Sequence, residues 1–172
     1  MKQNSEAWLL DANVFIEAHK RYYAFDICPG FWDCLSYYHD QGKLMSIDWV
    51  KKEIEANEDN LWDWVKNTAP EGFFQSSDEP TTQGFYSEII EWVSSEDFKN
   101  EEKTKFAAGA DGWLVAYTKT HDLILVTDEK SNPDIKRRVP IPNVCQQFDV
   151  PYINTFAMLR EMEITFGLQL PQ

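Results

Sequence analysis

Two aspartates directly follow short apolar segments, at positions where a carboxylate is available for chemistry. Asp11 comes after "WLL" and Asp128 comes after "LILVT". Both segments have the length and composition of buried strands. In open parallel sheets, ligands bind beyond the carboxyl ends of the strands, so both aspartates are candidate functional residues. An aspartate at such a position also commonly caps the following helix, and this structural alternative stays open for each residue alone.

Two further acids lie in segments with a helical pattern. Glu53, in "DWVKKEIEAN", is four residues after Trp49 and three after Val50, so on a helix it faces the core boundary, whereas Glu55 faces solvent. Asp111 lies in "KFAAGADGWLVAYTK", which we expect to be helical on both sides of the aspartate. A buried aspartate is unfavourable unless it is paired or bound to a cation. A surface glutamate and a helix cap are the structural alternatives for these two residues.

Four carboxylates at one edge of a sheet would repel one another, and their pKa values would rise. A hard divalent cation relieves this repulsion. Oxygen ligands without Cys or His favour Mg²⁺ or Mn²⁺ over Zn²⁺. Such a cation lowers the pKa of a bound water and neutralises the charge that develops on a phosphodiester. These acids therefore indicate a site for Mg²⁺ or Mn²⁺ and a hydrolytic reaction.

Four apolar segments predict the strands that would bring these acids together, at residues 7–10, 44–47, 123–127 and 150–153. Each is followed within a few residues by a helical pattern, and this alternation predicts a parallel sheet covered by helices. The expected fold class is a three-layer α/β/α domain with a central parallel sheet. We see no internal repeat or linker, so residues 1–172 are expected to form a single domain.

The expected helices complete this layout. Apolar residues at approximately helical spacing follow the first strand: Val14, Phe15, Ala18, Tyr22 and Phe25. The segment "PGFWDCLSYYHDQG" predicts a second helix, because a proline opens it and a glycine closes it. Residues 58–105 form a helical insert, in which "NLWDWVKN" and "TQGFYSEIIEWVSS" are separated by the turn-rich "APEGFFQSSDEPTTQG".

Composition narrows the classes of function. The net charge of −13 argues against a general nucleic-acid coat, because phosphate binding depends mostly on Lys and Arg, although a nuclease needs only a few cations. The three cysteines form no CxxC pair, which is typical of neither a zinc site nor a disulfide framework. No apolar run reaches the roughly 20 residues that span a bilayer. With no leader-like N-terminal pattern either, we expect a cytoplasmic protein without membrane contact.

The four acids, in the order Asp11, Glu53, Asp111 and Asp128, resemble the acidic quartet of the PIN domain, a metal-dependent ribonuclease fold. The resemblance covers nearly the whole chain. It rests on "LLDANVFIEA", "IDWVKKEIE", "AGADGWLVAYTKTHDLILVTDEK" and "IPNVCQQFDVPYINTFAMLREM". Within the superfamily, "RYYAFDICPGFWD" is similar to a bacterial PIN-like group.

This resemblance implies a metal-dependent endoribonuclease that hydrolyses RNA with Mg²⁺ or Mn²⁺. Asp11, Asp111 and Asp128 would be metal ligands or hold metal-bound waters. Glu53 would position the metal or the attacking water. The resemblance also implies frequent homodimers, and for toxin-like members of toxin–antitoxin pairs it implies an antitoxin protein as partner.

Asn13 and Thr127 would support the site, each expected to hydrogen-bond Asp11. The insert between Glu53 and Asp111 is longer than in the smallest toxin-like members, which puts their mode of antitoxin docking in doubt. The expected contacts to RNA phosphates are the basic residues Lys51, Lys52, Lys130, Lys136, Arg137 and Arg138.

Two other functions fit parts of the pattern. A phosphatase of the haloacid-dehalogenase type also has an Asp after its first strand, but it needs a second Asp two positions later, where this chain has Asn13. A non-catalytic PIN-fold module for binding or regulation is the other alternative. Intact acids at all four positions argue against such a module.

Overall fold

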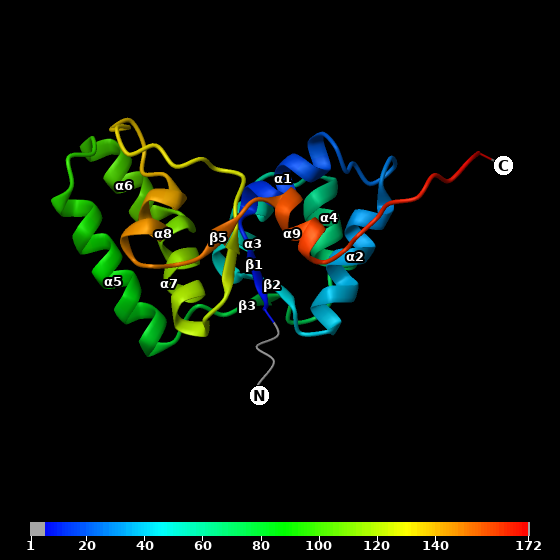
Figure 1. Cartoon of the computed structure of the whole chain (residues 1–172), viewed down its shortest axis with the longest axis horizontal. Helices are drawn as coiled ribbons and strands as arrows, with labels where there is room; N and C mark the ends of the chain where they lie inside the picture. Colours follow the sequence, from blue (N-terminus) through cyan, green and yellow to red (C-terminus); the bar gives the residue numbers. More distant parts are fainter. Residues whose placement is uncertain (1–5, 172) are drawn as a thin grey trace.

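A parallel β-sheet runs through the centre of the protein (Figure 1). The computed structural model describes residues 6–171, within which the sheet has five strands in the order β3-β2-β1-β4-β5. The strands are β1 (Trp8–Leu10), β2 (Leu44–Ile47), β3 (Phe74–Gln75), β4 (Ile124–Val126) and β5 (Tyr152–Ile153). All neighbouring strands are parallel. The expected fold class is therefore confirmed.

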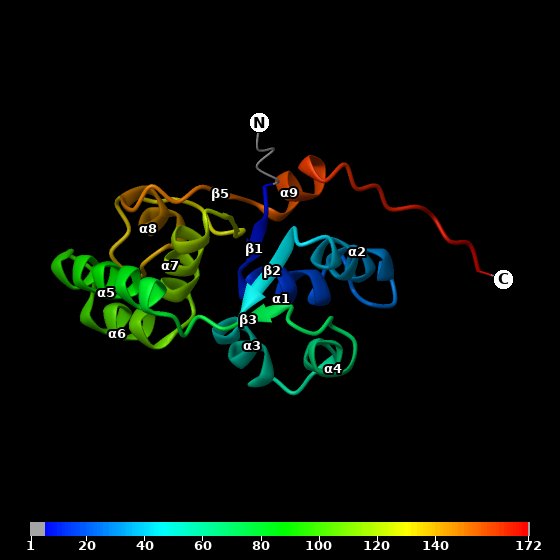
Figure 2. The same cartoon turned by 90° about the horizontal axis from the view of Figure 1, so that it is seen from below.

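Helices cover both faces of this sheet, as the two perpendicular views show (Figures 1 and 2). One layer contains α1 (Ala12–Lys20), α2 (Pro29–Asp40), α4 (Asn60–Asn67) and α9 (Thr155–Glu161), with α3 (Asp48–Glu55) packed against α1 and α4. The other layer contains α5 (Pro80–Ser95), α6 (Asn100–Ala108), α7 (Asp111–His121) and α8 (Ile141–Gln147). Because both faces of the central strand β1 are covered, its residues are all apolar and buried rather than alternating.

The four strands predicted from apolar segments are all present, but the sheet has a fifth strand that the sequence did not predict. β3 lies in the turn-rich segment and pairs with β2, with Phe74 opposite Ser46. The insert at residues 58–105 contains the expected helices, but part of the turn-rich segment between them extends the sheet, which the prediction of a helical insert did not include. Two residues are too few to show an alternating pattern, and the neighbouring Phe73 is anchored in the core with no exposed surface.

The first helix is shorter than expected. α1 ends at Lys20, and its C-cap is Arg21, so Tyr22 and Phe25 lie beyond the helix rather than on its apolar stripe. The backbone of Arg21 leaves the helical region at φ −130° and ψ −95°. Tyr22 consequently stands in a loop with 68% of its surface exposed.

The helix expected on both sides of Asp111 is interrupted. α6 ends at Ala108 and α7 begins at Asp111. Between them Gly109 adopts an extended backbone with φ −99° and ψ −174°. The interpretation of Asp111 as a residue in the middle of a helix is therefore wrong: it lies in the first turn of α7, where the helix dipole favours a negative charge.

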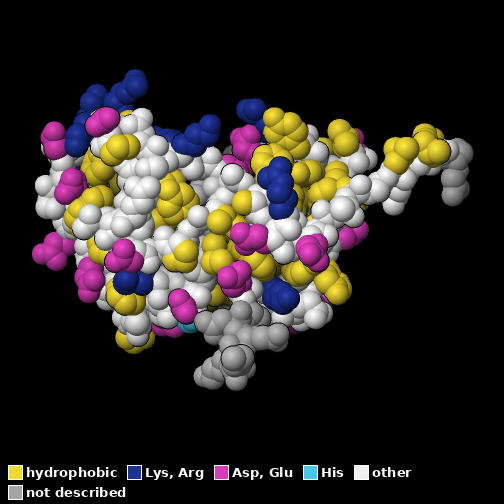
Figure 3. All heavy atoms as spheres, in the orientation of Figure 1, with side chains coloured by type: hydrophobic (Ala, Val, Ile, Leu, Met, Phe, Trp, Pro, Cys, Tyr) yellow, Lys and Arg dark blue, Asp and Glu magenta, His cyan; other side chains and the backbone are white. Residues whose placement is uncertain are grey.

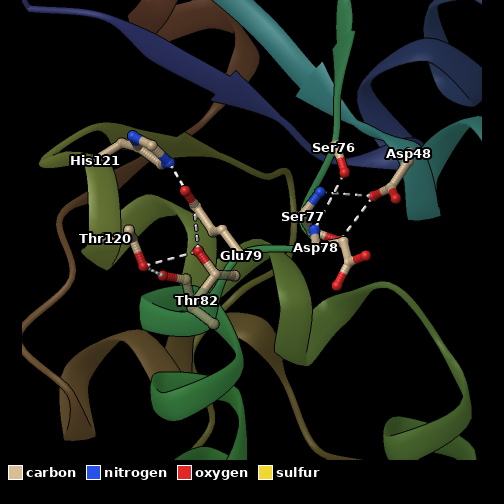
Figure 4. A network of polar contacts seen from close by, with 9 residues as sticks. Asp48, Ser76, Ser77, Asp78, Glu79, Thr82, Thr120 and His121 are labelled. Carbon is tan, nitrogen blue, oxygen red and sulfur yellow. Dashed lines mark hydrogen bonds and ion pairs between the residues drawn. The ribbon is translucent and has the colours of Figure 1, made fainter.

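Polar contacts fasten the segment after β3 to both helical layers (Figure 4). The Ser77 hydroxyl donates to Asp48 Oδ1 at 2.8 Å, at the start of α3. Glu79 Oε1 accepts from the Thr82 hydroxyl at 2.6 Å and lies 2.6 Å from Nε2 of His121, at the end of α7. The hydrogen bond from Thr82 is the main cause that lowers the pKa of the Glu79 carboxyl. These contacts fix the place where the chain crosses from one face of the sheet to the other.

Beyond α9 the chain extends away from the protein as an arm (Figure 1). Phe166 packs against Tyr23, with ring centroids 5.5 Å apart, whereas Leu168 and Leu170 are 84% and 75% exposed. Within residues 6–171, none of the helices combines the length and the hydropathy needed to cross a membrane.

Candidate active site

The carboxyl ends of β1 and β4 meet at the centre of the sheet, where the strand order reverses. β1 pairs with β2 on one side and with β4 on the other. The chain leaves β1 toward α1 on one face and reaches β4 from α7 on the opposite face. In open α/β sheets such a switch point opens a crevice in which ligands bind. Asp11 follows β1 here, and residues 127–129 follow β4.

Asp11 is a buried carboxylate, with 2% of its surface exposed. Thr127 Oγ1 donates a hydrogen bond to Asp11 Oδ2 at 3.0 Å. Burial raises the pKa of the Asp11 carboxyl to about 7, the hydroxyl of Thr127 opposes this rise, and the charges of Glu129 and Glu53 add to it. Asp11 occupies the N-cap position of α1, but its side chain makes no capping hydrogen bond. The backbone amide of Asn13, in the first turn of α1, still lowers the pKa of Asp11, so a contact with the start of the helix accompanies the hydrogen bond from Thr127.

Asp111 faces the same crevice from α7. Burial is the main cause that raises its pKa, and the charges of Asp11, Glu129 and Glu53 raise it further, whereas Arg138 lowers it. Each of these acids is therefore close enough to affect the ionisation of Asp111.

Glu53 is held beside the start of α7 by the backbone. Its Oε1 accepts from the N–H of Ala110 at 3.0 Å. Burial raises the pKa of Glu53, and this hydrogen bond opposes the rise. Glu53 is half-buried and Glu55 is exposed, as the spacing predicted. Because Ala110 precedes Asp111, the bond ties α3 to the segment that carries Asp111.

The two acids after β4 have different surroundings. Asp128 is exposed, and its Oδ1 and Oδ2 accept from the N–H and the hydroxyl of Thr155, each at 2.9 Å. Asp128 therefore fastens the start of α9 to the loop after β4. Glu129 is half-buried, and its Oε2 accepts from the N–H of Ile141 at 2.9 Å, at the start of α8.

The structure thus gathers Asp11, Glu53, Asp111 and Glu129, which we call the acid cluster. Sequence reasoning missed Glu129 and selected Asp128 in its place. A signal was present, because side chains alternate along an extended chain. If Thr127 contacts Asp11, then Glu129, two residues later, lies on the same side and Asp128 on the other. A role for Asp128 in catalysis stays a prediction.

Residues 8–166 match a protein family that is described as a domain of unknown function (DUF4411). The chain belongs to this family. No curated protein and no solved structure matches the chain. The match to DUF4411 covers the sheet, both layers of helices and the complete acid cluster. The acid cluster is therefore formed entirely by residues within the part of the chain that defines the family.

In this DUF4411 chain, two of the six predicted phosphate contacts lie beside the acid cluster. Arg138 and Lys130 are exposed and line a hollow together with Glu129, Asp128 and Asn13. Arg138 Nη1 lies 3.9 Å from Glu129 Oε1. Asn13 is exposed, and within residues 6–171 its side chain does not form the expected hydrogen bond with Asp11. The backbone amide of Asn13 lowers the pKa of Asp11 instead.

The other predicted phosphate contacts are exposed but have different surroundings. Lys51 and Lys52 lie on α3, where Lys52 Nζ is 4.4 Å from the ring centroid of Trp49. Lys136 Nζ is 5.7 Å from the ring centroid of Phe98, near the start of α6. Arg137 is exposed in the loop between β4 and α8. Figure 3 shows Lys and Arg side chains along the upper edge of the face it displays, to which the carboxyl ends of the strands point in Figure 1.

The donor atoms of the acid cluster fit a hard divalent cation, because all are carboxylate oxygens beside polar groups. Within the part of the chain that the structure describes, no Lys, Arg or His forms an ion pair with Asp11, Glu53 or Asp111. Among the same described residues, no three His, Cys, Asp or Glu side chains already stand close enough together to hold a metal ion. Binding of a cation would therefore require these side chains to turn toward one another.

Proposed function

We propose that this protein is a metal-dependent endoribonuclease whose active site is the acid cluster. One observation carries the proposal: two carboxylates, the buried Asp11 and the half-buried Asp111, lie at the switch point of a parallel sheet, with pKa values raised by desolvation and by neighbouring acids. Such an arrangement is unfavourable for the fold alone, so a ligand that neutralises it is the simplest explanation. The resemblance of the sequence to PIN domains supplies the reaction class.

Asp11, Asp111, Glu53 and Glu129 are the residues that would hold Mg²⁺ or Mn²⁺. The bound cation would supply an activated water and would neutralise charge on the phosphodiester. The residues around them have positioning roles. Thr127 fixes the orientation of Asp11 through its hydrogen bond, and the N–H of Ala110 fixes one oxygen of Glu53. The guanidinium of Arg138 and the ammonium of Lys130 would bind the phosphates of the substrate.

Cleavage of RNA by the purified protein tests this proposal. We expect cleavage of a single-stranded RNA with Mg²⁺ or Mn²⁺ and none with EDTA. We expect Asp111→Asn to lower the rate by more than about 100-fold, because loss of a residue that only supports a metal ligand already costs 10- to 100-fold. Asp40→Asn is the matched control, because Asp40 is exposed at the end of α2, before β2 and thus at the opposite edge of the sheet.

Circular dichroism would verify that each variant is folded. Cleavage that survives Asp111→Asn in a folded protein would exclude the acid cluster as the site. RNA binding without cleavage by the wild-type protein, in either metal, would instead support a non-catalytic module.

A further inference from the structure

An apolar hollow lies on the far side of Asp128 from the acid cluster. It has a volume of about 320 Å³, within the range of pockets that hold small organic groups. We call it the aromatic hollow, because Tyr22, Tyr23 and Phe156 form much of its lining. It is lined by α1 and the loop after it, by the loop after β4, and by the first turn of α9.

The aromatic rings at its edge are exposed although they are large. Tyr22 is 68% exposed and Phe156 is 44% exposed. Their ring centroids are 6.3 Å apart and the rings meet edge to face, at 68°. Core packing therefore does not explain them, since much of each ring is open to solvent. An exposed pair of rings over a hollow has the shape of a stacking platform.

The aromatic hollow adjoins the acid cluster through two further hollows. Lys130 and Asp128 line both the aromatic hollow and a central one of about 350 Å³. The central hollow in turn shares Glu129 and Arg138 with a third one of about 200 Å³, which Asp111 lines. The three hollows adjoin through these shared residues, and we call them together the groove; Lys130 and Arg138 lie between its aromatic rings and Asp111.

The two acids that line the aromatic hollow already have polar partners. Of the acids that line the aromatic hollow, Glu17 pairs with Arg21 at 2.7 Å, and both oxygens of Asp128 accept hydrogen bonds from Thr155. Lys130 is exposed at the junction with the central hollow. A phosphate there would meet a cation, and the base attached to it would meet the aromatic rings.

We infer that the aromatic hollow is a subsite for a nucleobase of single-stranded RNA, stacked on Tyr22 and Phe156, next to a phosphate at Lys130. The inference rests on the proposed function, because RNA is the substrate proposed for the acid cluster. Stacking on an aromatic ring accepts any base, since every base has a π face. The subsite would hold the strand beside the acid cluster without selecting its sequence.

Binding of a fluorescein-labelled single-stranded RNA in EDTA, followed by anisotropy, tests the subsite apart from catalysis. We expect Tyr22→Ala to weaken binding by roughly 5- to 150-fold, the range for loss of one base–aromatic stack. We expect Tyr22→Trp to bind like the wild type, because it restores an aromatic face. Tyr37→Ala is the matched control, since Tyr37 is a tyrosine 60% exposed on α2 and outside the groove. Phe156→Ala should weaken binding in the same direction as Tyr22→Ala.

A chain of abasic nucleotides of the same length separates stacking from an indirect effect of the substitution. We expect wild type and Tyr22→Ala to bind this abasic chain equally, and more weakly than the wild type binds RNA. Three outcomes would overturn the subsite. Tyr22→Ala could lose the same affinity for RNA as for the abasic chain, or it could bind RNA as tightly as the wild type. The third outcome is that the wild type binds no RNA. The wild-type protein could bind RNA in a way that depends on the bases and on Tyr22, yet cleave no RNA with Mg²⁺ or Mn²⁺. That result would support the subsite and refute the proposed nuclease activity.

Discussion

At the scale of single residues, burial of carboxylates at the centre of the sheet is the feature with the widest consequences. Asp11 has 2% of its surface exposed and Asp111 faces the same crevice, although both would be better solvated elsewhere. Active sites commonly retain such unfavourable charges because the reaction needs them. Two predictions follow from the surroundings of these acids.

The first prediction concerns pH. The pKa of Asp11 is about 7 in the folded protein, above its ordinary value of 3.8. Between these values the folded state holds a proton that the unfolded state has lost, so the contribution of Asp11 to the free energy of unfolding decreases as pH rises through this window. In EDTA at pH 8, we expect Asp11→Asn to stabilise the protein by about 1–2 kcal/mol, or roughly 2–8 °C in Tm.

Thermal unfolding of wild type and Asp11→Asn at pH 5 and pH 8 would measure this effect. The difference in Tm between the two proteins should be larger at pH 8, and Asp40→Asn should show no such change. Mg²⁺ should stabilise the wild type more than Asp11→Asn at pH 8. A variant less stable than the wild type at pH 8 in EDTA would contradict the prediction.

The second prediction distinguishes the two acids after β4. Glu129 belongs to the acid cluster, whereas Asp128 binds Thr155. We expect Glu129→Gln to lower RNA cleavage at least as strongly as Asp111→Asn, with little change in stability. We expect Asp128→Asn to keep more of the activity and to lower stability by about 1 kcal/mol, because one hydrogen bond to α9 is lost. Initial cleavage rates and urea unfolding would test both. The reverse ranking of rates would favour the quartet that the resemblance implied.

At the scale of elements, the start of α7 sets the position of Asp111, and glycines control how closely its neighbours approach. A Cβ added at Gly112 would lie 3.0 Å from Tyr86 and 3.1 Å from Phe106. Tyr86 cannot easily move away, because its ring stacks on Trp113 at 3.9 Å and its hydroxyl donates to Ala107 O at 2.8 Å. The tight packing therefore requires a glycine beside the catalytic candidate.

The third prediction compares two glycines in helices. We expect Gly112→Ala to lower the free energy of unfolding by about 1–3 kcal/mol, the usual effect of overpacking. Because α7 would shift, RNA cleavage should decrease as well. A Cβ added at Gly84, in α5, would have no other atom within 4 Å. Because alanine loses less conformational freedom in a helix than glycine, Gly84→Ala should instead stabilise the protein by about 0.5–1 kcal/mol. Chemical denaturation of both variants would test this contrast, and equal effects of the two substitutions would refute it.

The elements that the sequence predicted well are those with strong local patterns. Four strands lie at the expected apolar segments, and α2 begins at Pro29 as expected. β3 was missed because its two residues are specified by pairing with β2 rather than by their own pattern. The interruption before Asp111 was missed because the alanines around it favour a helix, whereas the extended backbone of Gly109 ends one. Glu129 was missed although the expected contact of Thr127 with Asp11 already placed Glu129, rather than Asp128, on the side of Asp11.

At the scale of the whole molecule, the extended arm at the end of the described chain contributes little to the fold. Leu168 and Leu170 are exposed, whereas Phe166 packs on Tyr23 and lies 3.4 Å from where a Cβ at Gly30 in α2 would be. The fourth prediction is that deleting residues 168–172 changes Tm by less than about 2 °C, as expected for exposed surface positions. Deleting residues 166–172 should lower Tm further, because the contacts of Phe166 are lost. Equal effects of the two deletions would contradict this assignment of the arm.

The order in which the acid cluster appears along the chain has a consequence for synthesis. Asp11 and Glu53 belong to the first half of the chain, and Asp111 and Glu129 belong to the second half. The central pair of strands likewise joins β1, the first to be translated, to β4, the fourth. A ribosome-bound chain that has not reached Asp111 lacks half of the cluster and also lacks β4, the strand beside β1. The acid cluster is therefore incomplete until the ribosome has read through Glu129, which is most of the message for this chain.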